Sequence, residues 1–470
     1  MIKYKLKLLL ITVTLSNSVL FSQNGFDYYL SKDSLYRYNS SAKIIDSLLN
    51  FKITESARDT SFYSSYGRAE VINLSQLLFF AVNNNPEIKS IEHKIESLDF
   101  QADEKSYLPD PMLEAELDNI MSDFKRVGMI NFFVSQMFPF PGKLGLEKKS
   151  VLNNKSMFES EKLDMAVSMM NMVKMNYYEL YFINHKLSIN QNNQLIVKTF
   201  ITAAESKYTV GKGMQQEVFK AQIELSRLIN EEFVLNQERK NKFSELTKLT
   251  KVNINENTRI NFSDIDPSFL LKTESFDFNE NETNKLIDYA LENRADLKTL
   301  RNKIIMNKTD IEMSKLSRMP DFSIRLGYKI LPFEERNAFS VMVGVNIPFA
   351  PWSSGKYGSS IKKTELNLKS TTDEYEAKRI ETRNEIVSIV NNIKSIKETI
   401  NYYHGVLIPQ TENTLKSTQY SYETNMTDFL DLLDSYRMYQ DANLMYFESL
   451  TMYLKMIAEL EKATGINLKN

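Results

Sequence analysis

The chain has 470 residues, of which 58 are Lys or Arg and 60 are Asp or Glu, so its net charge is −2. This balance argues against a nucleic-acid binder, which usually shows a basic surplus. The chain has no Cys and only three His. The side chains that thiol catalysis, metal binding and most hydrolytic reactions use are therefore absent or few. We therefore expect no catalytic residue, no cofactor and no metal site, and a protein that is not an enzyme.

The first residues have the pattern of a signal peptide. Lys3, Lys5 and Lys7 form a positive start, and residues 8–15 form an apolar stretch too short to span a bilayer. Small residues follow, and we expect cleavage after Ser22, with Ser18 as the alternative. Residues 1–22 are thus predicted to be removed from an exported protein, and the polar residues 23–73 are predicted to be irregular.

The rest of the chain reads as two copies of one unit. Residues 81–95 align with residues 290–304, and further short motifs recur in the same order, including Phe138-Pro139-Phe140 and Ile347-Pro348-Phe349. We assign residues 74–251 to the first copy, 252–283 to a linker and 284–470 to the second copy.

Each copy is predicted to contain two helices, two strands and a long helical hairpin. The strands are expected at about 112–119 and 128–138, and at about 321–330 and 339–349, because apolar residues there tend to alternate with polar or small ones. A helical run without Pro extends from about 142 to 207 and would reach about 95 Å. The hairpin tips are expected at about 208–213 and 422–427, and Pro409 is expected to kink the second long helix.

Four strands with one apolar face cannot close a membrane barrel, since known barrels need eight or more. Three chains would supply twelve strands and remove the open edges that a bilayer forbids. A soluble sandwich is the alternative from strand pattern alone, and the long hairpins argue against it. Positions expected to face the lumen are Ser323, Arg325, Lys329, Ser340 and Asn346. Positions expected to face lipid are Phe322, Ile324, Leu326, Tyr328, Val341, Val343, Val345 and Ile347.

These motifs resemble the TolC-type outer-membrane efflux proteins over nearly the whole mature chain. The resemblance rests on the duplicated helix starts, the Pro-Asp before each strand pair, the Tyr-x-Val-Gly turn at 208–211 and the Phe-Pro-Phe-Pro-Gly-Lys run at 138–143. The last run is most similar to the heavy-metal and cation efflux branch. The resemblance implies a homotrimer with a twelve-stranded β-barrel (four strands per chain) continuous with an α-helical coiled-coil barrel in the periplasm. Lipoprotein members carry a Cys after the signal peptide, so we expect no acyl anchor here.

The resemblance also implies roles for the hairpin tips. Gly211 and Asn425 stand at equivalent turns that need a positive φ, and Tyr208 and Tyr422 lie beside them. By resemblance these four residues contact a periplasmic adaptor. The acids Glu217, Asp428, Asp431 and Asp434 are assigned to the periplasmic aperture. By resemblance, Glu217, Asp431 and Asp434 match family positions near the closed aperture; the alternative interpretation is a solvated or helix-capping face.

The predicted function is a passive exit duct in the outer membrane, exporting small solutes or metal cations from a periplasmic adaptor and an inner-membrane pump. The alternatives are an exit duct for type I protein secretion and a periplasmic coiled-coil scaffold or adaptor without a pore. Met165, Met169 and Met172 follow helical spacing, and we interpret them as packing residues rather than ligands for soft metal ions.

Overall fold

The computed structural model describes residues 71–120, 127–255, 258–262, 265, 278–331, 336–348 and 350–465. The chain divides into two units, Met1–Tyr66 and Gly67–Asn470, and every described residue belongs to the second. The predicted signal peptide and residues 23–70 lie outside the described part.

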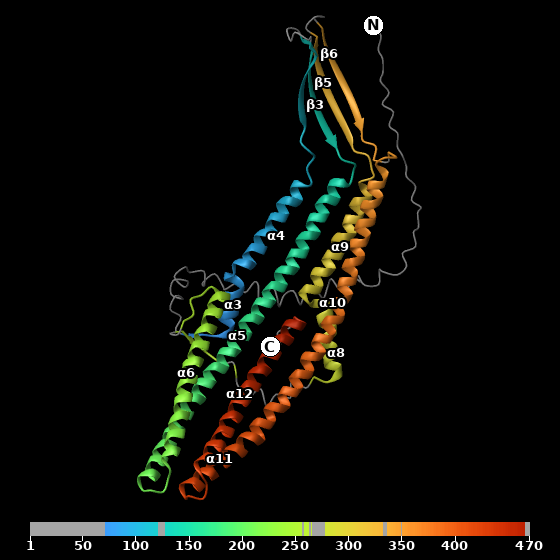
Figure 1. Ribbon diagram of the computed structural model, residues 1–470. Helices are drawn as coiled ribbons and strands as arrows, with labels where there is room; N and C mark the ends of the chain where they lie inside the picture. The colour runs from blue at the N-terminus through green and yellow to red at the C-terminus, as the bar shows by residue number, and fades with distance from the viewer. Residues whose placement is uncertain are drawn as a thin grey trace, which may run out of the picture. The chain divides into compact units, whose positions relative to one another are not determined.

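Along the described chain, the same order of element types occurs twice (Figure 1). The first series is α3 (Leu74–Asn84), α4 (Pro86–Glu104), β2 (Met112–Ile120), β3 (Val127–Phe138), α5 (Lys143–Thr209) and α6 (Gln215–Thr250). The second is α8 (Glu280–Asn293), α9 (Ala295–Leu316), β5 (Phe322–Leu331), β6 (Arg336–Val345), α10 (Ser354–Tyr402), η5 (Tyr403–Leu407), α11 (Ile408–Glu423) and α12 (Phe429–Thr464). Two short strands, β1 (Val71–Ile72) and β4 (Arg259–Ile260), pair in parallel.

Local sequence explains where the short helices begin. Asn73 caps α3, and its side chain and that of Gln76 each accept a hydrogen bond from the other residue's backbone N–H. Asn279 and Glu282 form the same capping box at α8. Pro86 opens α4, where its missing N–H costs nothing.

Several element boundaries differ from the sequence-based expectation, and three of them have a clear local cause. Residues 71–72 form β1 rather than irregular chain, because their backbone pairs with β4. Helix α8 begins at Glu280, inside the expected linker, because Asn279 supplies its cap. Strand β6 ends at Val345, short of residue 349: the Asn346 side chain accepts a hydrogen bond from the Asp321 N–H (2.6 Å), and Pro348 has no N–H to donate.

The long second helix changes its winding just before Pro409. The π-helical turn η5 separates α10 from α11, and Pro409 occupies the second position of α11. Proline has no N–H and its ring crowds the carbonyl four residues back, which here belongs to Gly405. The wider π turn accommodates this conflict at the place where the sequence predicts a kink.

Four strands form one antiparallel sheet in the order β2-β3-β5-β6, so β3 and β5 join the two series (Figure 1). The sheet adjoins the start of α5, and the helical tips lie at the far end of that helix. The main hydrophobic core packs the middle of α5 against α3, α8, α10 and α12, with Tyr177, Leu180 and Leu454 among its buried members. A second core near the tips contains Phe200, Leu228 and Tyr436. No helix among the described residues is both long and apolar enough to cross a bilayer.

Candidate functional site: a two-faced sheet and two helical tips

One face of the sheet is apolar and open to the surroundings. Because paired residues point to the same face, the register aligns Leu113, Val134, Leu326 and Val341 in one row across all four strands. The side chains of this row are 75%, 47%, 54% and 71% exposed. A monomeric soluble protein rarely exposes so large a continuous apolar surface, so this face is suited to contact with apolar surroundings.

The residues predicted to face lipid mostly lie on this apolar face. Phe322, Ile324, Val343 and Val345 are exposed members of neighbouring rows, and Tyr328 is half-buried opposite Phe339. Ile347 is 59% exposed but follows the end of β6, so it is not a strand position.

The opposite face is polar and carries its own ionic network. The Arg325 guanidinium lies 3.3 Å from the Glu114 carboxylate and 5.4 Å from the centre of the Phe133 ring. The Asn131 amide donates to Glu116 at 3.2 Å. Ser323, Arg325, Lys329 and Ser340 share this face by register, whereas Asn346 lies beyond β6 and bonds to Asp321. The acids of β2 were not among the positions predicted for this face.

A salt bridge holds the two halves together where the sheet meets the helices. The Lys143 ammonium lies 2.6 Å from the Asp321 carboxylate, which also accepts the Phe140 N–H at 2.8 Å. Burial alone would raise the pKa of Asp321, but these two donors and the Lys143 charge hold it below its usual value. The Pro-Asp and Gly-Lys motifs of the sequence therefore meet in space.

The two hairpin tips have the same backbone geometry. Gly211 has φ of +73° and Asn425 has φ of +62°, as the predicted turns require. The N–H of each donates to the carbonyl three residues back, Tyr208 or Tyr422, at 3.0 and 3.1 Å. The next residue's N–H bonds five residues back in both turns, at 2.8 Å, which completes a helix-ending motif of the Schellman type.

The two tip tyrosines differ in exposure. Tyr208 is 47% exposed, whereas Tyr422 is 3% exposed and belongs to the second core. The Tyr422 hydroxyl donates to Glu217 at 2.9 Å, and the Lys207 ammonium lies 3.6 Å from the centre of its ring. Burial, followed by the hydrogen bond to Glu217, raises the pKa of Tyr422. Tyr422 and Glu217 therefore link the two hairpins of one chain.

The four acids that follow the two tips differ in their surroundings. Asp428 caps α12, with its side chain accepting the Asp431 N–H at 3.0 Å, which is the helix-capping role. Asp431 and Asp434 are exposed on the following turns. Glu217 is half-buried against Tyr422, so these four acids do not form one equivalent set within a chain.

Sequence reasoning missed a buried acid that joins the hairpins further from the tip. The Glu224 side chain is 3% exposed and binds Arg227 on its own helix at 2.6 Å and Arg437 of α12 at 2.9 Å. Burial opposes its charge, but the two guanidinium groups outweigh burial and lower the pKa of Glu224. The Glu-x-x-Arg spacing was visible in the sequence, while Arg437 lies more than two hundred residues away.

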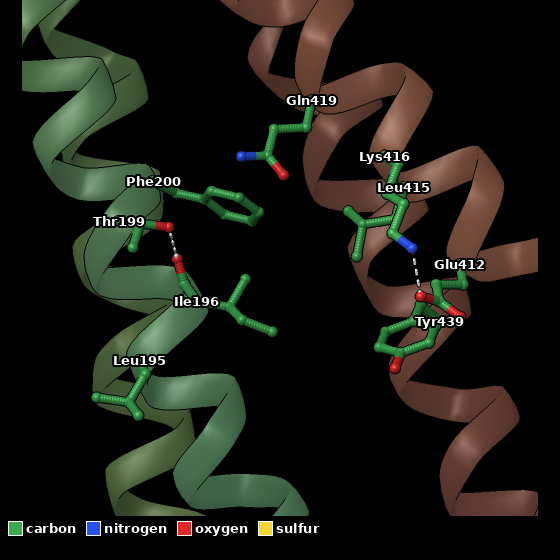
Figure 2. Close-up of a pocket in the computed structure, with 9 residues that line it drawn as sticks. All are labelled: Leu195, Ile196, Thr199, Phe200, Glu412, Leu415, Lys416, Gln419 and Tyr439. Atoms are coloured by element: carbon green, nitrogen blue, oxygen red, sulfur yellow. Dashed lines mark hydrogen bonds and ion pairs between the residues drawn. The ribbon is translucent and has the colours of Figure 1, made fainter.

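A groove of about 360 Å³ separates α5 from α11 and α12 near the tips (Figure 2). One wall presents Leu195, Ile196 and Phe200, and the other presents Leu415 and the Lys416–Glu412 ion pair (2.5 Å). No sequence pattern singled out this groove, because its walls come from segments far apart in the chain.

No cluster of three or more His, Asp or Glu side chains within the described ranges could hold a metal ion. Of the methionines interpreted as packing residues, Met169 is buried and accepts a hydrogen bond from Asn85, Met165 is partly buried, and Met172 is 45% exposed.

The fold is that of outer-membrane channel proteins. CusC, which forms a transmembrane channel, superposes with a TM-score of 0.70 at 13% identity, over 84% of this chain and 92% of CusC. The Campylobacter jejuni CmeC outer-membrane channel superposes with a TM-score of 0.65 at 14% identity, over 86% of this chain and 87% of CmeC. The open Neisseria gonorrhoeae MtrE outer-membrane channel superposes with a TM-score of 0.66 at 14% identity, over 84% of this chain and 89% of MtrE. The TolC-type resemblance noted in the sequence is therefore confirmed at the level of fold, and these neighbours are channels rather than enzymes.

One curated relative is a protein of metal resistance. The cobalt-zinc-cadmium resistance protein CzcC of Cupriavidus metallidurans is 20% identical over 181 residues, which is 38% of this chain and 42% of that protein. The match therefore spans less than half of either protein. No family model matches the chain.

Proposed function

We propose that this protein is the outer-membrane exit duct of a tripartite efflux system. The observation that carries the proposal is the antiparallel sheet with an exposed apolar face, a charged opposite face and two edge strands, β2 and β6. Open edges are not tolerated in a bilayer, so the edges of one sheet must pair with those of other copies. Three copies would close a twelve-stranded barrel with the Arg325 and Glu114 face towards the lumen.

In this proposal the long hairpins form the periplasmic part of the duct. Lipid would contact the rows containing Leu326 and Val341, and the helices would continue the passage into the periplasm. The tips at Gly211 and Asn425, with Tyr208, would meet an adaptor that connects to an inner-membrane pump. Because Tyr422 is buried, it would support the tip from inside.

Asp431 and Asp434 would surround the passage near its periplasmic end as rings of carboxylates in the trimer. Such rings favour cations over anions, because each ring concentrates negative charge at a narrow point. The duct itself would supply no energy, and solute would diffuse through water. The partial similarity to CzcC supports metal cations as cargo.

Single-channel recording tests the proposal. Purified full-length protein would be reconstituted in a planar bilayer, and multivalent cations would be added from the tip side. We expect a small, stable conductance that these cations block, with Asp431→Asn/Asp434→Asn weakening the block. A protein that stays monomeric and water-soluble and gives no conductance would instead be a periplasmic scaffold.

A further inference from the structure

The only tryptophan of the chain lies at the junction between the sheet and the helices. In the sequence, Trp352 stands between Ile347, which follows the end of β6, and Ser354, where α10 begins. Its side chain is 89% exposed. Tryptophan is enriched where a bilayer meets water, because its ring is apolar while its N–H needs a polar partner. The place of Trp352, between an exposed apolar sheet and a polar helix, fits such an interface.

The end of α9 and the start of α10 lie side by side next to the sheet (Figure 1). The Ser314 hydroxyl of α9 is 3.5 Å from the Ser360 hydroxyl of α10. The Arg318 Nη2 atom lies 3.7 Å from the point that a Cβ on Gly358 would occupy. Arg318 therefore extends from the end of α9 to the first turns of α10.

Two lysines share the face of α10 that carries Ser360. Lys356 precedes this serine by four residues and Lys363 follows it by three, which is the spacing of one helix face. Arg318, Lys356 and Lys363 are all exposed, and we call them the basic cluster. Within the described part of the chain, none of these three side chains forms an ion pair with an acid. The cluster therefore presents uncompensated positive charge beside the sheet.

The equivalent helices of the first series are neutralised. At the start of α5, the Lys148 ammonium lies 2.9 Å from the Asp103 carboxylate and the Lys155 ammonium 2.7 Å from the Asp99 carboxylate. Both acids belong to α4, which leads into the edge strand β2. A second copy paired along β6 would bring its α4 towards α10, but these two acids already have partners in their own chain. A partner for the basic cluster must come from elsewhere.

The start of α10 adds further positive potential. Its first turn holds no acid, and the cap residue Ser353 makes no side-chain hydrogen bond to the described chain. The start of α12 differs, since Asp428 caps it and Asp431 lies in its first turn. The free N–H groups at a helix start carry partial positive charge and favour phosphate groups. An anion with phosphate chemistry therefore fits this end of α10 together with the basic cluster.

We propose that Trp352 and the basic cluster bind the headgroups of anionic phospholipids in the leaflet that faces the helices. The inference rests on the proposed exit duct, because that function places the apolar sheet in a bilayer. In this arrangement Trp352 lies at the level of the headgroups, and the three basic side chains contact headgroup phosphates through charge-assisted hydrogen bonds. A zwitterionic headgroup carries its own cation, so its net attraction to the cluster is smaller.

The fluorescence of Trp352 tests the proposal directly, since the chain has no other tryptophan. Full-length protein is reconstituted in phosphatidylcholine vesicles that contain a small fraction of lipid brominated on its acyl chains. The brominated lipid is phosphatidylglycerol in one sample and phosphatidylcholine, at the same fraction, in the other. Bromine quenches indole fluorescence only at close range, so quenching reports the labelled lipid next to Trp352.

The test variant is Arg318→Gln/Lys356→Gln/Lys363→Gln. The matched control is Lys212→Gln/Lys285→Gln/Lys394→Gln, which removes the same charge from exposed lysines at a hairpin tip, on α8 and in the later half of α10. Both variants keep Trp352 as the reporter.

In the unmodified protein, we expect brominated phosphatidylglycerol to be enriched at least about fivefold over brominated phosphatidylcholine near Trp352. One basic side chain near a membrane surface typically gives a preference of about that size. The test variant should lose most of this preference, and the control variant should keep it. High salt should also weaken the preference, because it screens the attraction between charges.

Equal quenching by the two brominated lipids in the unmodified protein would overturn the proposal, as would an equal preference in the test and control variants. No quenching by either lipid would overturn it too, and would mean that a neighbouring copy covers this surface. Conductance of the same reconstituted protein separates these results from failure of the duct. Preferential quenching without conductance would remove the duct and keep the lipid site, and conductance with equal quenching would do the reverse.

Discussion

At the level of single residues, the sequence predicts backbone conformation better than it predicts burial. Gly211 and Asn425 have the positive φ that their turn positions require, since few other residues adopt it cheaply. Tyr422 and Glu224 are buried for a different reason: partners from another hairpin surround them. A glutamate is usually exposed and a tyrosine is intermediate, and nothing near either residue in the sequence identifies its distant partner.

Gly327 illustrates a residue fixed by close approach of neighbours. A Cβ at this position would lie 2.4 Å from the Ser340 hydroxyl and 2.8 Å from the Phe133 ring. We expect Gly327→Ala to lower the stability of the sheet by roughly 1–3 kcal/mol, as overpacking usually does. Gly355→Ala is the control, because its Cβ would meet nothing within 4 Å. Thermal unfolding of the two purified variants measures the difference, and equal melting temperatures would contradict the expected crowding.

Glu224 should make the stability of the helical hairpins depend on pH. Its pKa is lowered in the folded protein, so its contribution is present above the ordinary glutamate pKa of about 4.3 and is lost as pH falls below that value. At pH 7, Glu224→Gln should cost about 3 kcal/mol, because it leaves Arg227 and Arg437 without a buried anion.

The melting temperatures of Glu224→Gln and the unmodified protein should therefore differ most near neutral pH and converge in acid. Exposed Glu238 on the same helix provides the control. The melting temperature of Glu238→Gln should stay close to that of the unmodified protein, both near neutral pH and in acid. A gap that stays constant with pH would mean that Glu224 acts through packing rather than charge.

At the level of elements, periodicity locates strands and helices, while local hydrogen bonds set their ends. The alternation of apolar and polar residues indicates β5 and its two faces, because a strand turns successive side chains to opposite sides. The ends of β6 and the start of α8 depend on Asn346 and Asn279, whose side chains bond to nearby backbone. Alternation carries no information about such bonds, so these boundaries differ by several residues.

The two faces of β6 can be compared at neighbouring positions. Val343 lies on the apolar face, and Met342 lies on the polar face, paired with Arg325. In a membrane barrel, Val343→Asp should cost roughly 1 kcal/mol, because it places a charge against lipid near the end of the strand. Met342→Asp should be tolerated, since the new carboxylate would face water and Arg325. The amount of heat-stable, membrane-inserted protein after expression measures both variants, and equal loss or equal tolerance would argue against a lipid-facing surface.

At the level of the whole molecule, the strand pattern favours a barrel shared by several copies, but it does not specify how the copies would meet. The sheet has two edge strands in the described part of the chain, β2 and β6, and an exposed apolar face. In the proposed duct, further copies would pair with the two edges, and lipid would cover the apolar face. The register between β6 of one chain and β2 of the next depends on the tilt of the strands in a closed barrel, which no single-chain pattern specifies.

Cross-linking across this edge should yield a ladder that stops at three chains. The protein has no Cys, so introduced cysteines react only with each other. Ala115→Cys in β2 would be combined in turn with Phe339→Cys, Val341→Cys or Val343→Cys in β6, because all four positions lie on the apolar face. In one of these combinations the two sulfur atoms should come within bonding reach, since side chains on the same face of paired strands are close.

Denaturing gels after oxidation should then show one, two and three linked chains and nothing larger, because a ring closes on itself whereas an open assembly continues to grow. Ala115→Cys with Ser340→Cys, which points to the other face, is the control that should not link.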